Sequence, residues 1–82
     1  MTRAEVFERL NRIFRNVFDD EDIVVDDSTT VDDIEDWDSF EHINLLVAIE
    51  HGFGIKFNVK ETKKFENVGA MVDAIMEKLV TS

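Results

Sequence analysis

The sequence predicts an all-α fold: a four-helix bundle with three main helices, a short third helix and a long loop between the first two helices. Two observations lead to this prediction. Apolar residues recur at helical spacing in three long stretches, whereas no stretch shows the alternation typical of a half-buried strand. The 82 residues, 44% of them hydrophobic, suffice for one core. We therefore expect residues 1–82 to form a single domain without a deep catalytic cavity.

The first helix is predicted to begin after Thr2, which can form a capping box with Glu5. The apolar positions that follow are spaced as one helical stripe: Val6, Phe7, Leu10, Ile13, Phe14, Val17 and Phe18. The opposite face carries all four arginines of the chain: Arg3, Arg9, Arg12 and Arg15. We expect the apolar stripe to be buried and the arginine-rich face to stay in water.

Helical periodicity disappears between residues 19 and 38, where acids are mixed with turn-forming residues. The apolar residues of this segment are scattered: Ile23, Val24, Val25, Val31, Ile34 and Trp37. A loop of this length in a small domain is unusual unless it packs or functions, so we expect its aliphatic residues to hold it across the bundle. Thr30 is expected to cap a short helical turn through Ile34. Trp37 is expected to be a partly exposed ring at the mouth of the bundle.

The clustered acids of this loop do not match a specific metal site. Neither Asp19 nor Asp26 begins the alternating oxygen ligands, with glycine at the sixth position, that a calcium-binding EF-hand requires. We therefore expect no metal centre and only diffuse binding of cations.

The second helix is predicted over residues 39–51, with Asp38 as N-cap, Glu41 as its capping-box partner and Gly52 at its end. Ser39 then lies in the first turn. Its hydroxyl is expected to be in solvent, beside a helix N-terminus that can stabilise a phosphate ester.

Two apolar strips run along this second helix. One strip consists of Leu45, Leu46 and Ile49, with Ala48 beside them. The other strip lies nearer Ser39 and consists of Phe40, Ile43 and Val47. A helix with two such strips either lies deep in a bundle or uses one strip for partners, and periodicity alone favours burial of both.

The remaining chain predicts two more helices. Residues 60–65 are expected to form the short third helix, after an apolar connection over residues 53–57. Asn67 is expected to cap the last helix. The inner face of that helix is predicted to consist of Val68, Met71, Val72, Ile75, Met76 and Leu79.

The net charge of −10 is unevenly distributed along the chain. Thirteen Asp or Glu residues and no Lys or Arg lie between Asn16 and Ile55, while all five lysines follow from Lys56 onward. Such a field disfavours nucleic acid and anionic membranes and favours partners with basic patches. The absence of cysteine excludes disulfides and a thiol nucleophile. Residues 1–10 resemble neither a signal peptide nor a membrane span, so we expect a cytoplasmic protein. We also expect it to be a monomer.

His42 follows Ser39 by three positions, so a catalytic Ser–His pair is geometrically conceivable. The pair lacks an orienting third group and an oxyanion-binding turn. We interpret His42 as a hydrogen-bonded packing residue and expect no enzyme.

The tripeptide Asp38-Ser39-Phe40, the apolar helix behind it and the later Phe53-Gly54-Ile55 resemble the acyl carrier protein family over nearly the whole chain. The resemblance implies that Ser39, with Asp38 beside it, carries 4'-phosphopantetheine. It implies as partners a phosphopantetheinyl transferase and acyl-activating or acyl-transferring enzymes with basic patches. The partner-contact residues are expected to be Trp37, Phe40, Glu41, Ile43, Asn44 and Val47.

The residues leave two other functions open. The family shape also serves aminoacyl and peptidyl carriers, and the charge alone would fit an acidic protein-interaction module without a prosthetic group. Phe40 stands where the family usually has Leu, and Asn44 and His51 stand where its fatty-acid-synthesis members are typically acidic. We therefore expect a carrier with specialised partner enzymes rather than one of general fatty acid synthesis.

Overall fold

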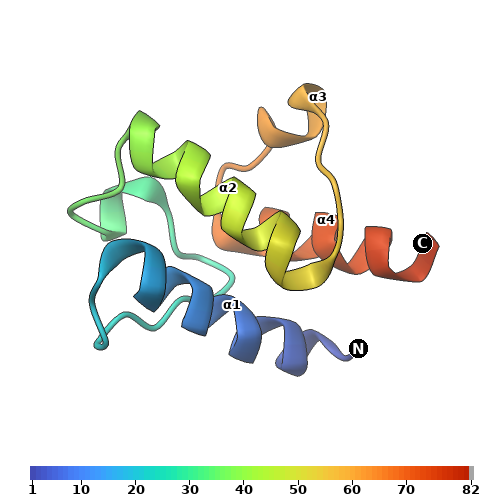
Figure 1. Cartoon of the computed structure of the whole chain (residues 1–82), viewed down its shortest axis with the longest axis horizontal. Coiled ribbons are helices and arrows are strands. Elements are labelled where there is room, and N and C mark those ends of the chain that lie inside the picture. The colour runs from blue at the N-terminus through green and yellow to red at the C-terminus, as the bar shows by residue number, and fades with distance from the viewer. Residues whose placement is uncertain (82) are drawn as a thin grey trace.

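The computed structural model describes residues 1–81 and contains four α-helices over that range, without a strand. They are α1 (Arg3–Phe18), α2 (Ser39–Phe53), α3 (Val59–Thr62) and α4 (Val68–Thr81). A 3-10 turn, η1 (Val31–Asp33), lies in the long loop between α1 and α2. α1 packs against both α2 and α4, and α3 is a single short turn (Figure 1). This confirms the predicted bundle of three main helices and one short helix.

The helical stripes of α1 and α4 pack as predicted. Thr2 and Glu5 form the expected capping box of α1. The fully buried residues of the core come mainly from the three long helices: Val6, Leu10, Phe14, Leu45, Ile49, Val68, Met71, Val72 and Ile75. Asn67 caps α4 through a hydrogen bond of 2.8 Å from the Ala70 N–H to its side-chain oxygen. Periodicity and capping residues therefore agree at the two outer helices.

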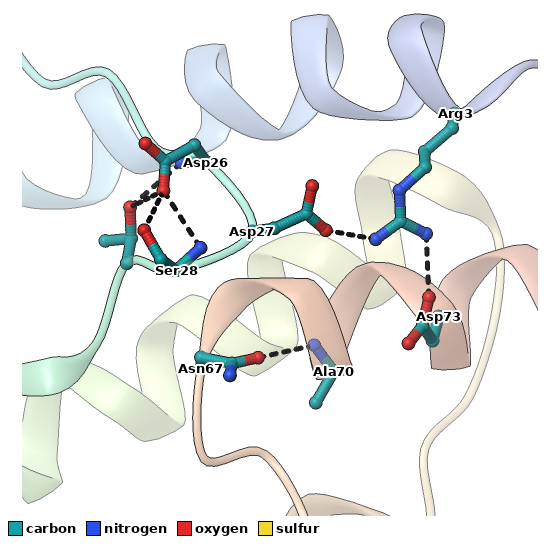
Figure 2. Close-up of polar contacts among 8 residues, drawn as sticks. Arg3, Asp26, Asp27, Ser28, Asn67, Ala70 and Asp73 are labelled. Atoms are coloured by element: carbon teal, nitrogen blue, oxygen red, sulfur yellow. Dashed lines mark hydrogen bonds and ion pairs between the residues drawn. The ribbon is translucent and has the colours of Figure 1, made fainter.

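Arg9 and Arg12 on the arginine face of α1 are exposed, as expected, but three arginines also bind neighbouring segments. Arg15 donates from Nε to the carbonyl of Ile23 at 2.8 Å, and Arg9 donates to the carbonyl of Gly52 at 3.1 Å. Arg3 pairs with Asp27 of the loop and, at 2.7 Å, with Asp73 of α4 (Figure 2). The long aliphatic stem of arginine lets its guanidinium reach acceptors on neighbouring segments, which a helical wheel does not show.

The first part of the long loop is fixed against the start of α4. The Val68 N–H donates to the carbonyl of Thr29 at 2.8 Å, and the Gly69 N–H donates to the carbonyl of Asp27 at 3.0 Å. These bonds satisfy amide groups that the first turn of a helix leaves without intrahelical partners. A Cβ on Gly69 would lie 2.8 Å from the Asp27 carbonyl oxygen, so this approach requires glycine. Figure 2 shows the loop passing α4 here.

Three helix boundaries differ from the prediction: the end of α2 and both ends of α3, which ends at Thr62 rather than at residue 65. α2 continues through Gly52 to Phe53, and the following Gly54 caps it in the left-handed conformation with φ 66°. That conformation is the usual role of glycine at a helix C-terminus, so the next glycine along the chain ends the helix. α3 begins earlier than predicted because Asn58 caps it by forming a capping box with Glu61.

Candidate functional site

Ser39 is the first residue of α2 and is exposed. The Asp38 carboxylate accepts the Glu41 backbone N–H at 2.8 Å, so Asp38 is the predicted N-cap. The second bond of a capping box, from the Asp38 N–H to the Glu41 carboxylate, is not formed. The Asp38 N–H donates instead to the carbonyl of Asp36 at 3.0 Å, and the Glu41 carboxylate accepts from Asn44 at 3.4 Å. The cap fixes the backbone on both sides of Ser39 and leaves the serine side chain at the surface.

Trp37 is buried, with 5% of its surface exposed, so the expectation of a partly exposed ring is wrong. Its ring contacts Phe14 edge-on, with ring centroids 5.3 Å apart, and lies 6.1 Å from the Phe18 ring. An indole brings more apolar surface than any neighbour in this acidic segment, so its burial is the largest gain available there. Trp37 therefore supports Ser39 from within the core rather than offering its ring to a partner.

His42 joins this aromatic cluster by a hydrogen bond. The Trp37 Nε1–H donates to His42 Nδ1 at 3.0 Å, and the two rings are inclined by 25° with centroids 5.9 Å apart. An indole N–H can only donate, so His42 Nδ1 is unprotonated and the proton of the neutral ring lies on Nε2. Burial also lowers the His42 pKa, which favours the neutral ring.

The arrangement confirms His42 as a hydrogen-bonded packing residue. Its Nδ1 lone pair accepts the Trp37 N–H, and Nε2 carries the proton. The neutral ring therefore has no second lone pair with which to deprotonate Ser39. The geometry does not support the Ser–His pair considered from the sequence.

An open groove of about 430 Å³ lies beside Ser39. It is lined by Val31, Trp37, Asp38, Ser39, His42 and Phe65. Phe65, which follows α3, is brought to the groove by the fold and has no signal in the local sequence. The groove thus combines apolar walls with the accessible serine and one imidazole.

The second apolar strip of α2 faces solvent, so the burial favoured by periodicity is wrong for it. Phe40 is 73% exposed, Ile43 63% and Val47 47%. Val59 of α3 adds a further apolar side chain that is 71% exposed, which sequence reasoning missed. A smaller groove of about 230 Å³ separates the two helices, lined in part by Ile43, Val47 and Val59. The short α3 leaves this side of α2 uncovered. Large apolar side chains that are exposed next to one another are typical of an interaction surface.

The predicted partner-contact residues therefore divide into two groups. Phe40, Ile43, Asn44 and Val47 are exposed on α2, and Glu41 is half-buried. Trp37 is separated from them by its burial. The acids Asp32, Glu35 and Asp36, which precede Ser39 in the chain, are also exposed. Exposed acids therefore precede the serine in the chain, and an exposed apolar strip follows it along α2.

Two further features of the described residues bear on the site. Within residues 1–81, no group of three or more His, Asp or Glu side chains is arranged to hold a metal ion. Over the same range, the helices are too short or too polar to cross a bilayer.

Comparison with known proteins identifies the family. No family model matches the chain. An acyl carrier protein of Petrotoga mobilis (strain DSM 10674 / SJ95) is 36% identical over 80 residues, which cover 96% of this chain and 93% of that protein. The solution structure of the holo acyl carrier protein from Geobacter metallireducens is 42% identical, with a TM-score of 0.88 over 93% of this chain and 87% of that one. With a shared helical fold and this identity along nearly its full length, the chain belongs to the acyl carrier protein family.

Proposed function

We propose that this protein is a carrier that holds an acyl group as a thioester on 4'-phosphopantetheine attached to Ser39. The observation that supports the proposal most directly is the exposed Ser39 side chain at the capped start of α2. The backbone before and after the serine is held by the Asp38 cap and by the buried Trp37, so the attachment point is rigid while the group it carries is free to move.

The residues around Ser39 fit the prosthetic group. A phosphodiester at the first residue of α2 lies at the positive end of the helix dipole, which favours its negative charge. The groove beside the serine has apolar walls, formed in part by Val31 and Phe65, against which a branched alkyl segment can pack. The Asp38 carboxylate is held in the cap by the Glu41 N–H, which fixes its orientation beside the attachment point.

The prosthetic group supplies the thiol that forms the thioester, and the chain supplies position and recognition. The exposed acids that precede Ser39 in the chain attract enzymes with basic patches by long-range electrostatics. The exposed apolar strip of Phe40, Ile43 and Val47, which follows Ser39 along α2, offers area for short-range contact. The carrier itself performs no bond chemistry in this proposal and is not an enzyme.

The partners that we propose are a phosphopantetheinyl transferase and acyl-activating or acyl-transferring enzymes of the cytoplasm. Phe40 makes the apolar strip bulkier than a leucine would. Neither Asn44 nor the exposed His51 adds a carboxylate to α2. We therefore favour partners dedicated to this carrier over the enzymes of general fatty acid synthesis. Aminoacyl or peptidyl cargo is the second candidate, because the same groove and serine would serve it.

Attachment can be tested by mass spectrometry. Incubation with coenzyme A and a broad-specificity phosphopantetheinyl transferase should add the mass of one phosphopantetheine group to the intact protein. Ser39→Ala should abolish the addition without changing the circular dichroism spectrum. Ser28→Ala is a matched control, because Ser28 is also exposed and lies in the loop, and it should be modified at the wild-type rate. Modification of the Ser39→Ala variant would refute the assignment. An unmodified wild-type protein would instead favour the acidic interaction module.

A further inference from the structure

The groove beside Ser39 contains a polar group that the proposed function does not use. Within residues 1–81 every buried side-chain nitrogen or oxygen has a hydrogen-bond partner, and the hydrogen bond of His42 is made by Nδ1. Because Nε2 makes no such bond, it must be accessible. His42 also lines the groove. An accessible imidazole nitrogen therefore lies on the same helix as Ser39, three residues along it, on a neighbouring part of the surface.

Trp37 determines what this accessible nitrogen can do. Since the indole N–H donates to Nδ1, the neutral ring carries its proton on Nε2 and presents a donor there. The indole is held in place by Phe14 and Phe18, so the imidazole partner is held as well. An accessible Nε2–H on a residue that lines the groove would combine one N–H donor with apolar walls, which suits a flexible chain that alternates alkyl segments with carbonyl or hydroxyl oxygens.

We propose that His42 is a positioning residue for the group attached to Ser39: its Nε2–H donates a hydrogen bond to a carbonyl or hydroxyl oxygen of the pantetheine arm. Trp37 keeps this donor available by fixing the imidazole tautomer, and the alkyl part of the arm packs against Val31 and Phe65. The proposal rests on the proposed function because the occupant of the groove is the arm itself. The occupant is tethered at the edge of the groove, so a single weak hydrogen bond acts at a high effective concentration.

The bound arm would alternate between the groove and solvent. A hydrogen bond of this kind contributes little in net free energy, since the arm also bonds to water when it is released. His42 therefore biases the arm toward the groove without trapping it, and the arm stays available to a partner enzyme. Asp38 is the one charged residue that lines the groove, and its carboxylate is engaged by the Glu41 N–H.

The test uses ¹⁵N-histidine-labelled protein before and after loading by the transferase, with loading verified by intact mass. Long-range ¹H–¹⁵N spectra of the unloaded protein should show the Nε2–H tautomer of His42. Loading should shift the His42 Nε2 resonance and slow the exchange of its proton. His51 is exposed on the same helix and serves as internal control, with signals that should not move.

Two variants separate the donor from the packing role. His42→Asn keeps an acceptor near the Nδ1 position for Trp37 but does not reach as far as Nε2, whereas His42→Gln extends an amide N–H toward that reach. With coenzyme A labelled in the pantoyl methyl groups, nuclear Overhauser contacts from those methyls to the Phe65 ring should be present in the wild type, weakened in His42→Asn and largely restored in His42→Gln. Thermal unfolding confirms that both variants are folded.

The outcomes distinguish this inference from the proposed function. Failure of loading would overturn the proposed function and the occupant of the groove together. Successful loading with unchanged His42 signals, or with methyl contacts equal in both variants, would overturn the positioning role alone. A His42 protonated on Nδ1 in the unloaded protein would overturn the tautomer argument.

Discussion

The two halves of the loop between α1 and α2 share an acidic composition but are attached to the bundle in different ways. The first half, residues 19–30, is held by several polar bonds to α1 and α4. Arg15 binds the carbonyl of Ile23, the Val25 N–H donates to Asn11 at 2.7 Å, and the carbonyl of Thr29 accepts from α4. The second half, residues 31–38, has one buried side chain, Trp37, which is 5% exposed, and one half-buried apolar side chain, Ile34.

The difference shows where the site is vulnerable. Bonds spread over the first half can be lost one at a time, because each contributes only about 0.5–1.5 kcal/mol. The second half leads directly into Ser39, and Trp37 is its most deeply buried side chain, with the partly buried Ile34 packed against the same core. The geometry of the serine should therefore respond to Trp37 more than to any acid in the loop.

The largest effect is expected from Trp37→Ala. Removing this ring leaves a cavity against Phe14 and Phe18, and large-to-small changes of this type cost about 3–5 kcal/mol. A domain of this size has an unfolding free energy on the order of 4–12 kcal/mol, so much of its stability would be lost. Urea unfolding followed by circular dichroism measures the change, since the only tryptophan is removed.

Phe40→Ala is the control for that experiment. It truncates an aromatic ring on the other side of Ser39 that is 73% exposed, so stability should change by no more than about 0.5 kcal/mol. Equal losses from the two variants would mean that the second half of the loop is not held by Trp37.

A smaller effect is expected where the first half of the loop meets α4. Gly69→Ala places a Cβ 2.8 Å from the Asp27 carbonyl oxygen, and this backbone atom cannot move without displacing the loop. The expected cost is about 1–3 kcal/mol, as for other overpacked sites. Gly52→Ala is the matched control inside a helix. Its Cβ would meet the flexible end of Ile13 at 2.7 Å, which can turn away, and the alanine gains helix propensity. Chemical denaturation should rank Gly69→Ala below Gly52→Ala, and the reverse order would contradict the close approach.

The same comparison explains how far the sequence could predict the structure. α1 and α4 were predictable because one apolar stripe and a capping residue at each start agree with each other. The burial of Trp37 could not be predicted, because a lone aromatic residue among acids has no periodic neighbours to show which way its side chain points. Its burial depends on Phe14 and Phe18, which lie some twenty positions earlier in the chain.

The candidate site was predictable at its attachment point and less so around it. Asp38 and Ser39 form a local signal, and a cap requires only neighbouring residues. Periodicity predicted both apolar strips of α2 but not which of them is exposed. That depends on tertiary packing, because the short α3 covers only part of α2. Phe65 and Val59 reach the grooves through tertiary structure alone.

A pH titration should reveal the Trp37–His42 bond as a modest effect on stability. Burial lowers the His42 pKa below its ordinary 6.5, so the unfolded chain binds this proton at a higher pH than the folded chain. The stabilising contribution is present above about pH 6.5 and is lost as the pH falls through the folded-state value. Protonated Nδ1 would also cease to accept the Trp37 N–H.

The control for this titration is His42→Gln, which lacks the titrating group. Asp38 and Glu41, the charged neighbours of His42 in the sequence, are present in both proteins and cancel in the comparison. The difference in unfolding free energy between wild type and variant isolates His42. That difference should shrink from pH 7.5 to pH 5.5. A difference that stays constant would mean that the bond does not couple to the proton.

The smallest effect on stability is expected from the exposed acids of the second half. The triple variant Asp32→Asn, Glu35→Gln, Asp36→Asn removes three charges that lie before Ser39 without removing a buried contact. Exposed substitutions of this kind change stability by no more than about 0.5 kcal/mol each, and relief of repulsion within a chain of net charge −10 works in the stabilising direction. These acids are expected to speed the encounter with basic partners. The second-order rate constant for modification by the phosphopantetheinyl transferase should therefore fall in the triple variant and become less sensitive to salt.

The control is the triple variant Asp19→Asn, Glu21→Gln, Asp22→Asn. It changes the charge of the first half by the same amount, farther from Ser39 along the chain, and should be modified at nearly the wild-type rate. If both variants slow the transferase equally, net charge rather than the placement of the acids attracts the partner, and the two halves of the loop do not differ in recognition.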